Sequence, residues 1–232
     1  GGEVSRVGNF ILKNQDLAAH IILLPHTLHS CSETLKKLKE NVSIICRERR
    51  SYEYALKYMH ETQVFLCDDM VFGADITPFL KTPEVHLNIY YEIFKDILNR
   101  LTKGNEHDFG VSISCAIKSI FLKYDISSNC KTLNAFRVDV EKTDIIIPDD
   151  NIDISAVYEL SSCQPNLIQW STYRFLQHIN HYDVINTNRL HVAIAAAKLG
   201  KKVNLYGNNY FKIKAIYNYS MKEKFPNVTW ME

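Results

Sequence analysis

The sequence predicts an α/β protein made of two Rossmann-like halves, each with a parallel sheet. Short apolar runs rich in β-branched residues alternate with longer segments whose apolar residues recur every three or four positions. This alternation is typical of βα units. A polar break at 103–108 and an irregular stretch at 125–131 separate the halves, so we expect an N-terminal half over 1–107 and a C-terminal half over 108–232.

Strands are expected, in chain order, over 20–25, 42–47, 63–67, 133–138, 183–187 and 202–206. Helices are expected over 32–40, 50–60, 83–102, 166–181, 189–199 and 212–224. The first of these helices opens with Ser32 as its predicted N-cap, and Gly200 follows the fifth as a C′ glycine. Gly1-Gly2 suggests the end of a glycine turn with no strand before it, so the first half is expected to be incomplete at its N-terminus.

Composition narrows the class of protein. The 27 basic and 26 acidic residues give a formal charge of +1, whereas nucleic-acid-binding domains are usually markedly basic, so nucleic acid is not an expected partner. No apolar run approaches the roughly 20 residues of a membrane helix, and a cytoplasmic location is expected. The six cysteines form no C-x-x-C pair and are predicted to be reduced core thiols: Cys31, Cys46, Cys67, Cys115, Cys130 and Cys163.

The most informative segment spans 183–200, where a buried strand runs directly into a helix opening Asn188-Arg189-Leu190-His191. In an open parallel sheet, ligands bind past the carboxyl ends of strands, and a helix N-terminus attracts anions. This position predicts an anionic substrate. A lone histidine in an apolar helix is more often a hydrogen-bonded core residue, but His191 on the first turn, beside Arg189, is suited to sensing an anion.

Two further arginines follow predicted strands. Arg47 ends the second strand, and on spacing alone a salt bridge with Glu48 or Asp68 is the favoured interpretation. Arg137 ends the fourth strand, where it either faces a ligand or pairs with Asp139.

The last predicted strand is followed by Gly207, Asn208, Asn209, Tyr210 and Phe211, and then by Lys212. This turn is expected at the same sheet edge as Arg189, although a surface loop with a solvated lysine is a plausible alternative. Neither metal-ligand spacing nor a phosphate-binding glycine loop nor a G-x-S-x-G elbow is present, so we predict no metal site, no P-loop and no hydrolase triad.

Taken in order, these segments resemble the polysaccharide pyruvyl transferase family. The run from Ile21 to Leu28 resembles the family's strand followed by Leu-Pro-Gln-Thr-Ile, with His26 in place of Gln. Residues 47–51 fit an Arg-acid-x-x-Ser motif, and 63–70 match the strand and Asp-Met after it. Residues 137–141 resemble Arg-x-Asp-x-Glu, residues 183–191 resemble the strand with Arg-Leu-His, and residues 208–212 resemble Asp-Asn-Ser-Tyr-Gly-Lys, with Gly207 at the family's Asp.

The resemblance implies a two-domain fold similar to GT-B glycosyltransferases and transfer of a carboxyethylidene group from phosphoenolpyruvate to a sugar, with no metal or organic cofactor. It implies catalytic roles for Arg189 and His191, with His191 in acid/base work or phosphate stabilisation. Donor-binding roles are implied for Arg47, which would clamp the donor together with Arg189, and for the backbone N–H groups around Leu190 and for Lys212. The remaining candidate substrate-binding residues are Arg137, Asn208 and Asn209.

The expected partners are phosphoenolpyruvate and a glycan or lipid-linked oligosaccharide of exopolysaccharide biosynthesis, which is compatible with peripheral membrane association. Two alternatives stay open. One is a GT-B-type glycosyltransferase whose Arg189 and Lys212 hold the diphosphate of a nucleotide sugar. The other is a non-catalytic module of a polysaccharide-biosynthesis protein. The sequence does not predict the acceptor sugar or the oligomeric state.

Overall fold

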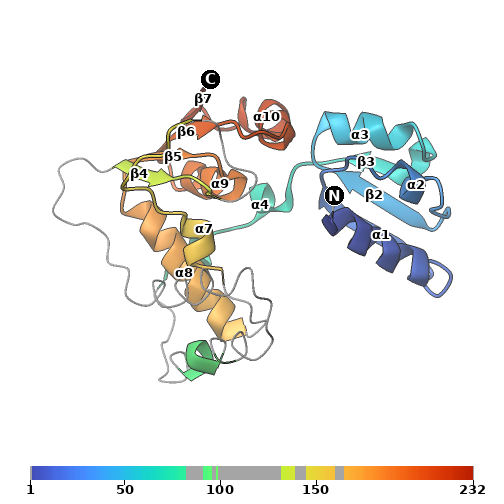
Figure 1. The fold of residues 1–232 in the computed structure, drawn as a ribbon, viewed down its shortest axis with the longest axis horizontal. Coiled ribbons are helices and arrows are strands. Elements are labelled where there is room, and N and C mark those ends of the chain that lie inside the picture. Colours follow the sequence, from blue (N-terminus) through green and yellow to red (C-terminus); the bar gives the residue numbers. More distant parts are fainter. Residues whose placement is uncertain are drawn as a thin grey trace. The chain divides into compact units, whose positions relative to one another are not determined.

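The computed structural model describes residues 2–81, 91–95, 98, 132–138, 145–159 and 165–231 (Figure 1). The chain divides into two compact units. Unit 1 comprises Gly1–Ala74 and Phe211–Pro226, and unit 2 comprises Asp75–Tyr210 and Asn227–Glu232. The expected boundary between residues 107 and 108 falls outside the described residues.

Unit 1 contains a three-stranded parallel sheet in the order β1-β2-β3, with helices between the strands. Each strand pairs with the next one along the chain, which is the arrangement of successive βα units. Its elements are α1 (Gly2–Asn14), β1 (Ile21–His26), α2 (Ser32–Leu35), β2 (Val42–Cys46), α3 (Arg49–Leu56), η1 (Glu61–Gln63), β3 (Val64–Leu66) and α4 (Met70–Gly73).

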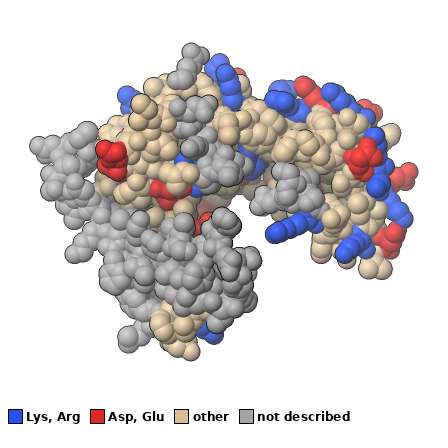
Figure 2. Space-filling view, in the orientation of Figure 1, with Lys and Arg blue, Asp and Glu red and all other residues tan. Residues whose placement is uncertain are grey.

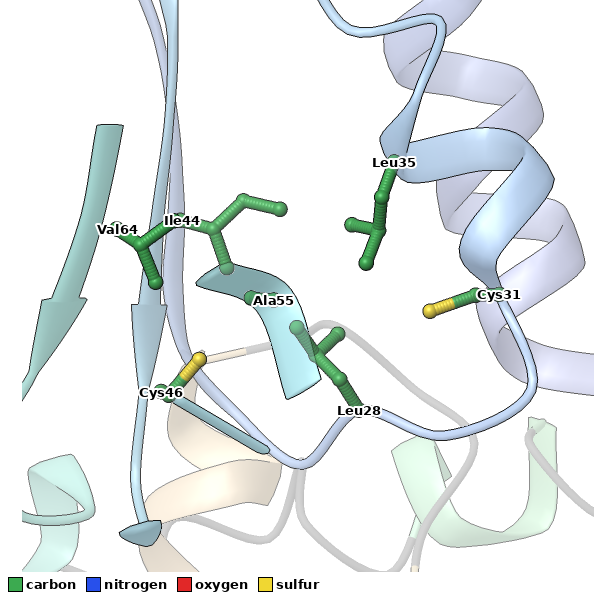
Figure 3. Close-up of a cluster of buried hydrophobic side chains, with 7 residues drawn as sticks. All are labelled: Leu28, Cys31, Leu35, Ile44, Cys46, Ala55 and Val64. Atoms are coloured by element: carbon green, nitrogen blue, oxygen red, sulfur yellow. The ribbon is translucent and has the colours of Figure 1, made fainter. Parts of the chain in front are cut away.

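The core of unit 1 lies between the sheet and helices α2 and α3. Figure 3 shows its buried side chains, which come from the loop after β1, from α2, β2, α3 and β3: Leu28, Cys31, Leu35, Ile44, Cys46, Ala55 and Val64. Burial raises the pKa of the Cys46 thiol to about 12, so Cys46 is a neutral core side chain. Cys31 and Cys46 are buried as predicted, but the prediction was wrong for Cys67, which is exposed just after β3.

The surface of unit 1 carries both signs of charge. Lys and Arg are interspersed with Asp and Glu on the face shown in Figure 2. Unit 1 also has exposed ion pairs between Lys36 and Glu33 and between Lys39 and Asp16. Exposed pairs of this kind contribute little stability.

Unit 2 contains a four-stranded parallel sheet in the order β4-β5-β6-β7. Helix α9 packs on β5 and β6, and α8 packs on α9. The elements are η2 (Thr77–Leu80), β4 (Thr132–Ala135), α7 (Ile154–Val157), α8 (Pro165–Asn180), β5 (Val184–Thr187), α9 (Leu190–Lys198), β6 (Lys202–Tyr206) and β7 (Val228–Met231).

One face of this sheet carries a row of asparagines. Asn134, Asn186 and Asn204 stand opposite one another in register on β4, β5 and β6. The Asn204 amide donates to Asn186 Oδ1 at 2.8 Å, Asn186 to Asn134 Oδ1 at 2.8 Å, and Asn134 to Asp150 Oδ1 at 2.8 Å. The row links three strands through side chains in addition to the backbone ladder.

The segment between β6 and β7 belongs to unit 1. It forms α10 (Lys212–Ile216) and a π-helical turn labelled η3 (Tyr217–Met221). The Arg50 guanidinium lies 3.9 Å from the centre of the Phe211 ring, and the Phe72 and Phe225 rings are 5.8 Å apart. Aromatic and cation–π contacts therefore help to hold this segment in unit 1.

The structure confirms the α/β class and a strand at each of the six predicted positions. Helix α9 ends as predicted: Gly200 has a φ of 74°, the Gly200 N–H donates to Ala197 O and the Lys201 N–H to Ala196 O, which is a Schellman motif.

Other predictions were wrong. Residues from Gly2 onward form α1 and not a glycine turn, and the N-cap of α2 is Cys31 and not Ser32. Strand β7 was not predicted. Most of the helix predicted over 83–102 lies outside the described residues, although 91–95 are helical.

Candidate functional site

The carboxyl edge of the unit 2 sheet gathers six of the predicted site residues. Strands β4, β5 and β6 are adjacent and parallel, and Ala135, Thr187 and Leu205 lie in register near their ends. The segments that leave these strands therefore emerge at one edge. They carry Arg137 after β4, Arg189, Leu190 and His191 after β5, and Asn208 and Asn209 after β6.

Two fully buried residues fix the turn from β5 into α9. The Thr187 hydroxyl donates to Ala135 O at 2.7 Å and accepts the Arg189 N–H at 3.0 Å. Asn188 Oδ1 accepts the Arg137 N–H at 2.8 Å. These bonds link the ends of β4 and β5 and the residues that follow the two strands.

Arg189 forms an ion pair that the sequence did not predict. Its Nη2 donates to Asp153 Oδ2, and both side chains are largely buried, with 19% and 10% of their surface exposed. Asp153 also accepts the Ala156 N–H at the start of α7. A planar guanidinium held by a carboxylate has its remaining N–H groups oriented in advance.

His191 and Leu190 occupy the first turn of α9. The His191 side chain is exposed, which excludes the core-histidine interpretation, whereas Leu190 is 7% exposed. Arg189 is the N-cap residue, and its side chain does not cap the helix. The N–H groups of this turn therefore lie at the same edge as the imidazole, a position suited to an anion.

The turn after β6 is shaped by Asn208 and Gly207. Asn208 Oδ1 accepts the Tyr210 N–H at 3.2 Å, as in an Asx turn. A Cβ built at Gly207 would lie 3.3 Å from the Trp230 ring. A side chain at this position, such as the Asp of the resembling family, would therefore require the Trp230 ring to shift by a few tenths of an ångström.

Arg47 sits in a buried network at the carboxyl edge of the unit 1 sheet. Its Nε donates to Thr27 Oγ1 at 2.9 Å and its Nη1 to Asp69 Oδ2 at 2.5 Å. The expected salt bridge exists, but the predicted partners were wrong, since the acid is Asp69 and not Glu48 or Asp68. The network joins the segments that follow β1, β2 and β3.

Glu48 has a different role. It is fully buried, and its carboxylate accepts the Ser51 N–H at 3.0 Å as the N-cap of α3. Ser51 Oγ in turn accepts the Leu28 N–H at 2.7 Å. The N-terminus of α3 is thus occupied by a carboxylate of the chain itself and is not available to an external anion.

Lys212 begins α10 and is half-buried in unit 1. It directly follows Phe211, the ring beneath Arg50. Within the described ranges, no group of three or more His, Cys, Asp or Glu side chains is arranged to hold a metal ion. Among the described helices, none is long and apolar enough to span a membrane.

Together these features define an α/β protein whose sheet edges carry arginines held by buried acids. The family model for polysaccharide pyruvyl transferase matches residues 14–210, and the chain belongs to that family. Among solved structures, the crystal structure of an uncharacterized protein from Klebsiella pneumoniae is similar, with a TM-score of 0.67 and 26% identity over all of this chain and 70% of that chain. The comparison with curated proteins finds no match.

Sequence reasoning missed Thr27, Asp69, Asp153 and Asn188. All four are distant in sequence from the arginines they contact, although Thr27, Asp69 and Asn188 lay within segments already singled out. The signal for Asn188 was an asparagine directly after a buried strand and directly before a helix.

Proposed function

We propose that this protein transfers a carboxyethylidene group from phosphoenolpyruvate to a sugar of a surface or extracellular polysaccharide. The observation that carries the proposal is the family match over residues 14–210. The position of Arg189, Leu190 and His191 at the start of α9 supports it, because the donor carries both a phosphate and a carboxylate and this edge suits anions.

The chemistry requires a general acid. The methylene carbon of the donor accepts a proton, and a sugar hydroxyl adds to the carbon that becomes electrophilic. A second hydroxyl then displaces phosphate, which leaves a cyclic ketal. Of the two hydroxyl protons, one balances the new methyl group and the other leaves with phosphate. We assign the protonation to His191, whose exposed imidazole can exchange protons with solvent.

Arg189 is assigned to the anionic groups of the donor, with the backbone N–H groups around Leu190. Arg137, Asn208 and Asn209 leave the same sheet edge and are further candidates for substrate contacts. Arg47 and Lys212 belong to unit 1, and their donor-binding roles are proposed from the motif match alone.

We also propose that the fold is similar to that of the GT-B class and that the protein is cytoplasmic. Phosphoenolpyruvate is the proposed donor substrate, and no further cofactor is proposed. The acceptor is a glycan or a lipid-linked oligosaccharide.

The proposal is tested by incubating the protein with phosphoenolpyruvate and a panel of sugar acceptors, while phosphate release and the mass of the glycan are followed. We expect ketal formation that is lost in Arg189→Ala and in His191→Ala. Arg6→Ala is the matched control, because it removes an exposed positive charge from α1. Full transfer activity in both site variants would refute the assigned roles.

Ligand binding distinguishes pyruvyl transfer from the glycosyltransferase and non-catalytic alternatives. A ligand at 100 times its dissociation constant stabilises a protein by about 2.7 kcal/mol, which a thermal-shift titration detects. Stabilisation by phosphoenolpyruvate supports pyruvyl transfer. Stabilisation by UDP or GDP alone would favour a glycosyltransferase, and stabilisation by none of them would favour a non-catalytic module.

A further inference from the structure

Two asparagine amides at the carboxyl edge of the unit 2 sheet have N–H₂ groups with no hydrogen-bond partner among the described residues. Asn188 is 0% exposed, and its Nδ2 has no hydrogen-bond partner within the described part of the chain. The Nδ2 of Asn208 is also buried and has no partner among those residues. Leaving a buried N–H₂ group unsatisfied costs about 1–3 kcal/mol, so such groups in native proteins call for an explanation.

The other atom of each amide is already engaged. Asn188 Oδ1 accepts the Arg137 N–H at 2.8 Å, and Asn208 Oδ1 accepts the Tyr210 N–H at 3.2 Å. These bonds fix the orientation of both amides and leave only donors over. A molecule that satisfies them must therefore present hydrogen-bond acceptors, such as the oxygens of a phosphate or a carboxylate.

The topology brings the two amides to one edge. Asn188 follows β5 directly and Asn208 follows β6, and Thr187 lies in register with Leu205 on these adjacent parallel strands. Asn188 also precedes the first turn of α9, a nine-residue helix whose N–H groups emerge there. The buried amide and the helix N-terminus are independent sources of donors at the same place.

Neutral hydrogen-bond donors are important at this sheet edge because Arg189 is paired with an acid. Arg189 is paired with Asp153, so the pair as a whole carries no net charge. Recognition of an anion at this edge then depends on N–H groups as well as on the guanidinium.

We propose that Asn188 and Asn208 form an amide pair that donates hydrogen bonds to oxygens of the anionic donor substrate. This inference rests on the proposed function for the identity of the donor, an enol phosphate that bears a carboxylate. Asn188 is then both a substrate-binding residue, through Nδ2, and a positioning residue for the Arg137 backbone, through Oδ1.

Asn188→Asp separates these two roles. The aspartate keeps an oxygen to accept the Arg137 N–H, but it replaces the unused donor with a negatively charged oxygen. Asn208→Asp makes the same exchange after β6. Asn166→Asp, at an exposed position in the first turn of α8, adds the same charge to unit 2 without removing a buried amide and is the matched control.

The experiment measures the dissociation constants of phosphoenolpyruvate and inorganic phosphate by calorimetry for each variant, with folding checked by circular dichroism. We expect Asn188→Asp and Asn208→Asp each to weaken phosphoenolpyruvate binding by about tenfold or more, the cost of one hydrogen bond to a charged group. Asn166→Asp should bind as the unmodified protein does. Should Asn188→Asp fail to fold, Asn208→Asp tests the same pair.

Unchanged binding in folded Asn188→Asp and Asn208→Asp would overturn the inference while leaving the proposed function intact. If the unmodified protein binds phosphate but not phosphoenolpyruvate, the proposed function fails. In that case a loss of phosphate binding in the two variants still supports the amide pair, and equal phosphate binding overturns it. Binding of neither anion by the unmodified protein would refute both.

Discussion

Lowering the pH should destabilise unit 2 through one buried histidine. His178 on α8 is 0% exposed, its Nδ1 lies 3.0 Å from the Tyr158 hydroxyl, and its ring stacks on Tyr182 with centroids 5.9 Å apart. Burial, aided by the charges of Arg174 and His181, lowers the pKa of His178 to about 4. The folded protein therefore holds this imidazole neutral.

The sign and size of the effect follow from linkage. An unfolded histidine has a pKa of about 6.5. Between about pH 6.5 and pH 4, His178 therefore binds a proton in the unfolded chain but not in the folded one. The stability that His178 contributes is complete above about pH 6.5 and is lost as the pH falls toward 4. Each pKa unit corresponds to about 1.4 kcal/mol, so the loss between pH 7 and pH 5 is about 2 kcal/mol.

The assay is urea unfolding followed by tryptophan fluorescence at pH 7 and pH 5. Both tryptophans of the chain, Trp170 and Trp230, lie in unit 2, so the signal reports this unit. His178→Gln provides the control because glutamine does not titrate, and the carboxylates that also titrate in this range are common to both proteins.

The expected result is that the difference in unfolding free energy between the two proteins shrinks by about 2 kcal/mol from pH 7 to pH 5. A difference that stays constant across this range would show that the His178 pKa is ordinary and that its burial is not what the structure indicates.

Three further predictions concern stability. Gly200→Ala should lower the free energy of unfolding by about 1 kcal/mol in the same urea assay, because a φ of 74° is unfavourable for a residue with a Cβ. Asp69→Ala should cost about 3–5 kcal/mol in melts followed by circular dichroism, since it leaves Arg47 buried without its acid. Restoration by a second change, Arg47→Met, is expected, and no restoration would contradict an ion-pair origin of the loss. Asn186→Ala should cost about 1–3 kcal/mol by breaking two links of the asparagine row. A stability equal to that of the unmodified protein would show that the row contributes nothing.

The strands were predictable because each is a local pattern. The run Val42–Cys46 is rich in β-branched residues, and Lys202–Tyr206 alternates polar with apolar residues. Strand β7 was not predicted because its four residues, Val228–Met231, are too few to show a clear pattern. Helix α1 was not predicted because it contains Gly2 and Gly8, and glycine has poor helix propensity.

The placement of Arg189 and His191 at a sheet edge was also predictable, since a parallel strand followed by a helix fixes where the connecting residues emerge. The partners of the arginines were not. Asp153 is 36 residues from Arg189, and Asp69 is 22 residues from Arg47. Spacing favours near neighbours such as Glu48. In the fold, however, Glu48 caps the N-terminus of α3, and Arg47 pairs with Asp69, which follows β3.

The segment from Phe211 to Pro226 determines the order in which the protein can be completed during synthesis. Lys224 pairs with Asp68 and Phe225 contacts Phe72, so unit 1 includes residues translated about 150 positions after its own sheet. A nascent chain that has already produced β1, β2 and β3 must grow by about 150 more residues before these contacts can form. The first sheet therefore lacks these contacts until β4, β5 and β6 have also been synthesised.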